Sequence, residues 1–88
     1  NLLLAQQSEQ INKLNKMLDN DNQLVKLKTE ITKTTASKLK NGTITSADYV
    51  RDLQAETVSK INRELHQIQL DEAKEKYNLI KGKTSSVQ

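Results

Sequence analysis

The sequence predicts an all-α protein, an antiparallel hairpin of two long helices joined by one short turn. The 88 residues contain no proline and only two glycines, so few positions interrupt a helix. Apolar residues recur at helical spacing on both sides of a single break near Gly42. Aromatic residues make up only 2% of the chain, so we expect a thin core and an elongated shape.

The first helix is expected over residues 1–40. Lys38 and Lys40 lie in its last turn, where positive charge is favourable because the helix dipole is negative at that end. The apolar stripe of this helix shifts by about one residue between an early and a later group. The early group is Ile11, Leu14 and Leu18, and the later group is Leu24, Leu27 and Ile31.

A turn is expected at residues 41–45. Gly42 suits the left-handed conformation that commonly ends a helix, and Asn41 precedes it. The pair Asn-Gly also occurs in turns between β-strands, but the flanking residues lack the two-residue alternation of strands. We therefore predict a short turn between two helices, an αα-hairpin, which makes the two helices antiparallel neighbours.

The second helix is expected over residues 46–82, followed by a disordered tail at residues 83–88. Thr45 is predicted to cap this helix, with Asp48 three residues later completing an approximate capping box. Ile44 is placed to pack against Tyr49 across the cap.

Two apolar stripes lie on different faces of the second helix. The second stripe begins two positions after the first ends, a rotation of about 200°. A single partner helix cannot cover both faces, so we expect neighbours on more than one side, supplied by other copies or by other parts of a longer chain. The alternative is an imperfect two-helix coiled coil with some exposed leucines. The first stripe is Val58, Ile61, Leu65 and Ile68, and the second is Leu70, Ala73, Tyr77 and Ile80.

The charges do not favour nucleic-acid binding. The net charge is +3, and all of this excess positive charge lies in residues 1–44, which contain seven lysines and four acidic residues. These lysines are scattered around the helix, with no arginine or aromatic residue among them to stack on bases. We expect solvated faces and no nucleic-acid partner.

No catalytic residue, cofactor or metal ion is predicted. His66 is the only histidine, and on a helical projection it lies about 160° from Ile68, so we expect it to point to solvent. The segment Asp19–Glu30 has acids at the spacing of a calcium loop, but Leu24 occupies the position that needs glycine.

Acidic residues form a ridge near the start of the second helix. Asp48, Asp52 and Glu56 recur every four residues, and such like-charged neighbours repel one another. The helix dipole compensates Asp48, which lies in the first turn. Asp52 and Glu56 lie farther along, which leaves room for a functional role of the ridge.

The turn resembles a known family. Gly42, Thr45 and Asp48 form the pattern G-x-x-[ST]-x-x-D, which is similar to the periplasmic tip of the TolC family of outer-membrane efflux proteins, in particular short-tipped members from Bacteroidetes-like bacteria. The resemblance covers about residues 30–82. Its downstream elements are Tyr49, Val50, Leu53, Ala55, Leu65, Ala73, Tyr77, Ile80 and Gly82.

This resemblance implies a homotrimer whose helices form a long periplasmic tunnel, of which this chain is the lower coiled-coil hairpin. Small molecules or proteins pass outward from an inner-membrane pump, which a periplasmic adaptor joins to the tunnel. By the same resemblance, the tip residues contact the adaptor, and the chain belongs to the bacterial outer membrane with this segment in the periplasm. The tip residues are Asn41, Gly42, Thr43 and Ile44.

The resemblance also implies a pore-lining role for Asp48 near the closed end of the tunnel. Arg51 occupies the position where some family members have a second acid, which leaves Asp48, with Asp52, as the pore-lining candidates. The alternative function is a self-associating coiled-coil scaffold or interaction module.

Overall fold

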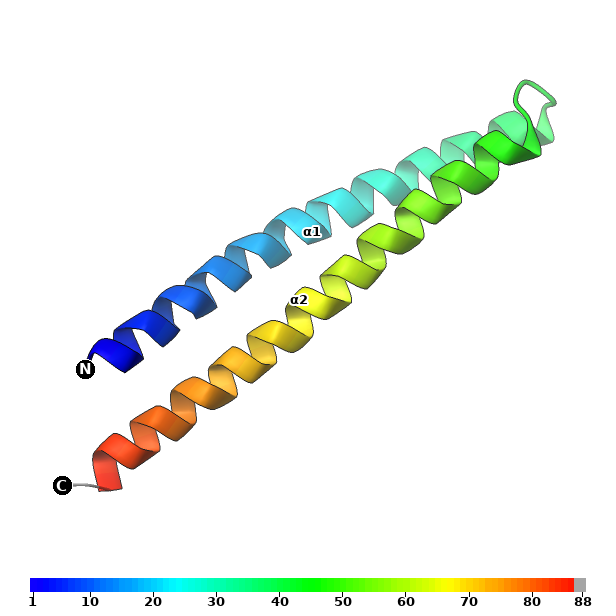
Figure 1. Cartoon of the computed structure of the whole chain (residues 1–88). Coiled ribbons are helices and arrows are strands. Elements are labelled where there is room, and N and C mark those ends of the chain that lie inside the picture. The colour runs from blue at the N-terminus through cyan, green and yellow to red at the C-terminus, as the bar shows by residue number, and fades with distance from the viewer. Residues whose placement is uncertain (87–88) are drawn as a thin grey trace.

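The structure, a computed structural model, describes residues 1–86 and consists of two long helices in a rod (Figure 1). Helix α1 spans Leu2–Lys40 and α2 spans Ser46–Ser86, so both termini lie at one end and the turn at the other. The rod measures 70 × 14 × 12 Å. The all-α prediction is confirmed for the described residues, which contain no strand.

The helix ends follow the predicted boundaries with one exception. Asn1 caps α1, since its Oδ1 atom accepts a hydrogen bond from the Leu3 N–H at 2.9 Å. The prediction that the second helix ends at Gly82 is wrong, because α2 continues to Ser86. Among the described residues only Gly42 has a positive φ, so Gly82 is an ordinary helical residue and makes no left-handed cap. Residues 87 and 88 of the expected tail lie outside the described residues.

The helices meet along a seam whose residues recur at intervals of three and four, the heptad spacing of a coiled coil. In the half nearer the termini the seam is apolar. Leu14 and Leu18 of α1 form a buried cluster with Leu70 and Ala73 of α2, and Ile11 packs against it. The early stripe of the first helix and the late stripe of the second therefore face each other.

In the half nearer the turn the seam is mostly polar. The hydroxyls of Thr32, Thr35 and Ser59 each donate to the carbonyl four residues earlier in their own helix, at 2.9, 2.8 and 3.0 Å. The Thr35 hydroxyl also contacts Oδ2 of Asp52 on α2, so its single proton is shared between two acceptors. Among the described residues no buried side-chain donor or acceptor lacks a partner, so the two helices can bury these polar groups. The buried seam residues of this half are Val25, Thr32, Thr35, Glu56 and Ser59.

Candidate functional site: the turn and the outer aliphatic stripes

The turn ends α1 with a Schellman motif, a pair of backbone hydrogen bonds around a left-handed residue. The N–H of Gly42 donates to the Leu39 carbonyl at 3.0 Å, and the N–H of Thr43 donates to the Lys38 carbonyl at 2.9 Å. The Thr43 hydroxyl also donates to the Lys38 carbonyl, at 3.1 Å. Gly42 has a φ of +75°, which explains why glycine stands here.

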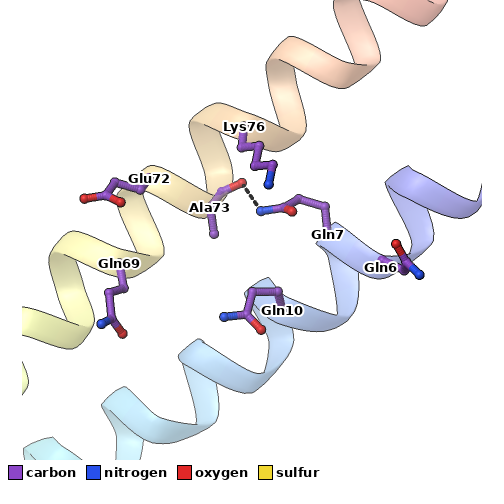
Figure 2. A pocket seen from close by; sticks show the side chains of 7 residues that line it. All are labelled: Gln6, Gln7, Gln10, Gln69, Glu72, Ala73 and Lys76. Carbon is purple, nitrogen blue, oxygen red and sulfur yellow. Dashed lines mark hydrogen bonds between the residues drawn. The ribbon is translucent and has the colours of Figure 1, made fainter.

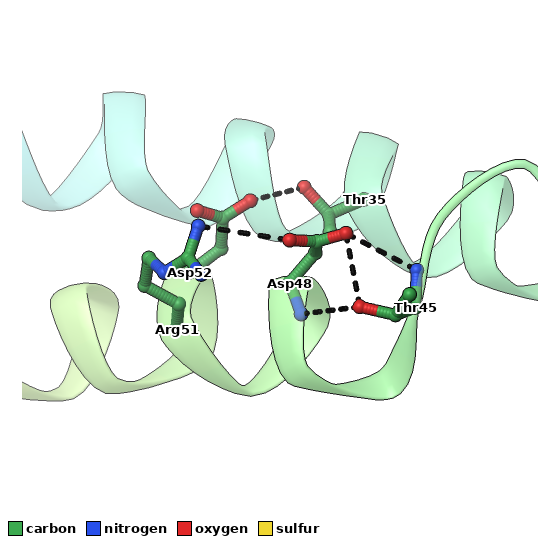
Figure 3. A network of polar contacts seen from close by, with 5 residues as sticks. All are labelled: Thr35, Thr45, Asp48, Arg51 and Asp52. Carbon is green, nitrogen blue, oxygen red and sulfur yellow. Dashed lines mark hydrogen bonds and ion pairs between the residues drawn. The ribbon is translucent and has the colours of Figure 1, made fainter.

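Thr45 and Asp48 hold each other at the start of α2 (Figure 3). The Thr45 N–H and hydroxyl donate to Oδ2 of Asp48 at 3.2 and 3.0 Å, and the Asp48 N–H donates to the Thr45 hydroxyl at 3.3 Å. Nη1 of Arg51 lies 3.6 Å from the other Asp48 oxygen. The Thr45 N–H, the Thr45 hydroxyl and the Arg51 charge together lower the pKa of Asp48. The turn therefore carries a fixed carboxylate at neutral pH.

The predicted tip residues form the end of the rod. Asn41, Gly42 and Thr43 are exposed, whereas Ile44 is half-buried. The two capping arrangements fix the backbone on either side of them, so the tip is presented in one conformation.

The three residues of the acidic ridge lie in two places: Asp48 at the turn, and Asp52 and Glu56 at the seam between the helices. Asp52 is half-buried, and its Oδ2 atom accepts a hydrogen bond from the Thr35 hydroxyl of α1 at 2.5 Å (Figure 3). Glu56 is buried, and its Oε2 atom lies 2.8 Å from Nζ of Lys60. Hydrogen bonds from Lys60 and then Thr32 lower the pKa of Glu56. Two of the three acids thus face the partner helix.

The prediction that His66 points to solvent is wrong. Its Nδ1 atom contacts Oδ2 of Asp21 across the seam, and the two side chains are only 24% and 15% exposed. The expectation assumed that Ile68 faces the partner helix, but Ile68 lies on the outer side of α2. The residue opposite Ile68 therefore faces α1.

Apolar periodicity does not predict the polar seam residues Thr32, Thr35 and Ser59. The sequence does contain a pattern that finds them. From Leu18 to Thr35 the heptad intervals continue without a break, although the residue type changes from apolar to polar.

Two aliphatic stripes face outward. The outer α1 stripe (Leu24, Leu27 and Ile31) and the outer α2 stripe (Val58, Ile61, Leu65 and Ile68) are substantially exposed, the latter at 51–56%. On a heptad projection they lie about 100° and about 150° from the seam, respectively. Both stripes lie along the part of the rod where the seam itself is polar. Apolar surface in this part of the hairpin therefore faces outward, away from its own partner helix.

A groove near the termini is lined by glutamines from both helices (Figure 2). Nε2 of Gln7 donates to the Ala73 carbonyl at 3.1 Å, while Gln10 and Gln69 extend into the groove from opposite helices. Its other lining residues contribute an amide, a carboxylate and an ammonium group, and no histidine, serine or cysteine. The Gln7 hydrogen bond links α1 to α2 across this groove.

Within residues 1–86, no three His, Asp or Glu side chains lie close enough together to hold a metal ion. In the same range neither helix is apolar enough to cross a bilayer. Comparison of the chain with protein-family models, curated proteins and solved structures gave no match.

Proposed function

We propose that the hairpin is a wall segment of an outer-membrane efflux duct, with its helices in the periplasmic part of a homotrimer. The turn docks a periplasmic adaptor, which joins the duct to an inner-membrane pump. The duct exports small molecules or proteins.

The observation that carries this proposal is the direction of the outer stripes. Val58, Ile61 and Ile68 are more than half exposed, although aliphatic side chains gain free energy when they leave water. Helices of a closed wall have neighbours on two sides, so each needs a second apolar stripe outside its own hairpin. The hairpin has such stripes on both helices.

The turn supports the docking role. Thr43 is exposed between a Schellman motif and a capping box, which together hold the tip in place without a core beneath it. A fixed tip loses little conformational freedom when it binds. Asp48 adds a negative charge at the same end, where three copies around an axis make an electronegative ring that favours cations.

Site-specific crosslinking in cells tests the proposal. A photoreactive amino acid replaces Thr43 in the full-length protein, with the exposed shaft residue Asn12 as the matched control. We expect an adduct with a periplasmic adaptor, identified by mass spectrometry, from position 43 and none from position 12. In the same cells, Ile44→Glu is expected to cause accumulation of a fluorescent efflux substrate.

The proposal fails if the full-length protein fractionates away from the outer membrane, or if cells without it expel the substrate as fast as the wild type. The outer stripes alone also fit a second function, a self-associating coiled-coil scaffold. In a scaffold, changes at Thr43 and Ile44 are silent, and disruption of the outer stripes alone abolishes function.

A further inference from the structure

We propose that Asn41 is a deamidation site that the turn holds closed, so that its side-chain amide is lost only when the Schellman motif opens. The two reacting groups are the amide of Asn41 and the backbone nitrogen of Gly42. The inference does not rest on the proposed duct, because the reaction needs only the chain itself and water.

The sequence makes Asn41 the best candidate for this reaction in the chain. It is the only asparagine that is followed by glycine. In deamidation the backbone nitrogen of the next residue attacks the side-chain carbonyl carbon of asparagine, and a side chain on that next residue hinders the approach. Glycine has no Cβ, so its backbone can come close. Asn41 is also exposed at the end of the rod, where water reaches its amide.

The reaction proceeds through a cyclic succinimide. Hydroxide removes the proton of the Gly42 N–H, and the nitrogen bonds to Cγ of Asn41 while the bond from Cγ to the side-chain nitrogen breaks. That nitrogen takes a proton from water and leaves as ammonia, which regenerates the hydroxide. Water then opens the ring at one of its two carbonyls and gives aspartate or isoaspartate at position 41. The net change is one water consumed and one ammonia released.

The backbone conformation of Asn41 is wrong for ring closure. The ring contains both Cβ of Asn41 and the Gly42 nitrogen, so these two atoms must lie on the same side of the Cα–C bond. The ψ angle of Asn41 is −1°, which turns the Gly42 nitrogen toward the Asn41 nitrogen and away from Cβ. Ring closure therefore requires a rotation about this bond, one of the two soft torsions of the residue.

The hydrogen bonds of the Schellman motif oppose that rotation. The Gly42 N–H, whose proton must be removed, donates to the Leu39 carbonyl at 3.0 Å. The Thr43 N–H donates to the Lys38 carbonyl at 2.9 Å. Both bonds must break before the nitrogen can turn toward the side chain. Helix ends open at a lower free-energy cost than helix centres, so we expect the turn to slow the reaction without abolishing it.

The products fit the turn less well than asparagine does. Isoaspartate adds a methylene to the main chain, so the N–H groups of Gly42 and Thr43 no longer align with their carbonyls. Aspartate keeps the backbone but adds a negative charge at the end of α1, where the helix dipole is also negative. Lys38 and Lys40 in the last turn offset only part of that charge. We therefore expect deamidation to loosen the tip permanently.

Peptide mapping by mass spectrometry tests the site. The wild-type chain and a short peptide with the sequence of residues 39–44 are incubated at mildly alkaline pH, and the conversion of Asn41 is followed over time. We expect the folded chain to react roughly tenfold more slowly than the peptide, as an opening cost of about 1.4 kcal/mol gives.

A pair of variants at position 43 tests the role of the Schellman motif. Thr43→Pro removes the N–H that donates to Lys38 and leaves the pair Asn41–Gly42 intact. Its rate should approach that of a peptide with the same substitution, while circular dichroism shows that the helices persist. Thr43→Ala retains the N–H and is the matched control, so it should react as slowly as the wild type.

Two results would overturn the proposal: a wild-type chain that reacts as fast as the peptide, or a Thr43→Pro chain that reacts as slowly as the wild type. Thermal unfolding checks the consequence. The purified isoaspartate form should unfold at a lower temperature than the unmodified chain, with the Asn41→Asp variant between them. Equal unfolding temperatures for all three would contradict the loosening of the tip.

Discussion

Nδ1 of His66 and Oδ2 of Asp21 meet at mid-length of the seam, close to the boundary between its apolar and polar halves. Both residues occupy heptad positions at which a coiled coil ordinarily has aliphatic side chains. A polar pair at such positions gives up apolar burial but disfavours other registers, because a shift by one heptad separates the two groups: Asp21 then lies opposite Ser59 or Ala73, and His66 lies opposite Leu14 or Lys28. We infer that this pair fixes how α1 and α2 align.

The first prediction concerns this pair. Asp21→Leu and His66→Leu alone should each destabilise the hairpin by about 1 kcal/mol, because each leaves one polar group half-buried without its partner. The double variant should recover that loss, since two leucines at facing heptad positions extend the apolar seam. Urea denaturation of all four chains measures the coupling. Additive losses in the double variant would show that the two side chains do not interact.

The second prediction uses the two glycines as a matched pair. Gly42→Ala should destabilise the hairpin by about 1 kcal/mol, because alanine at a φ of +75° is strained. Gly82→Ala should raise stability slightly, by up to about 1 kcal/mol, because Gly82 is helical. An added Cβ meets nothing within 4 Å at either site, so backbone conformation alone sets the sign. Changes of the same sign in thermal unfolding would contradict this account.

The hairpin and its turn could be predicted because the determinants are local. Gly42, Thr45 and Asp48 specify their conformations through neighbours within five residues, and such contacts can be inferred from spacing alone. The end of α2 could not be predicted in the same way. Gly82 permits a left-handed cap but does not require one, and a helical glycine costs only about 1 kcal/mol.

Which residues of α2 form the seam depends on which of its two apolar stripes faces α1. The sequence alone does not determine this. Ile61 belongs to the longer aliphatic series, so hydrophobicity favours it as a seam residue, yet the structure leaves it 53% exposed. Ser59 and His66 take the inward positions instead. The apolar contacts of Leu70 and Ala73 fix the face of α2 near the termini, and a rigid helix carries that face toward the turn.

The third prediction is an acid-induced loss of stability that depends on the cap. The pKa of Asp48 is lowered in the folded chain from an ordinary value of 3.8, mainly by the Thr45 N–H. A depressed pKa stabilises the fold fully above that ordinary value, and the stabilisation is lost as pH falls through the lower folded pKa. Glu56 contributes in the same direction, from an ordinary value of 4.5.

Helicity followed by circular dichroism between neutral and strongly acidic pH checks this prediction. Asp48→Asn should weaken the acid dependence, because the titrating cap is gone, and should lower stability at neutral pH. Thr45→Ala should weaken it less, since the Thr45 backbone N–H remains as the main donor. Acid profiles of Asp48→Asn and the wild type with the same slope would remove Asp48 from this role.

The fourth prediction tests the charge at the tip as a pore element. In the full-length protein reconstituted in planar bilayers, Asp48→Ala should reduce cation selectivity and change the dependence of conductance on divalent cations, because a ring of carboxylates attracts cations. Glu75→Gln removes a charge from the exposed shaft of α2 and serves as the control. Both variants lose one negative charge, so a specific effect of Asp48 reflects its place at the turn. If Asp48→Ala and Glu75→Gln conduct alike, Asp48 is a helix cap and nothing more.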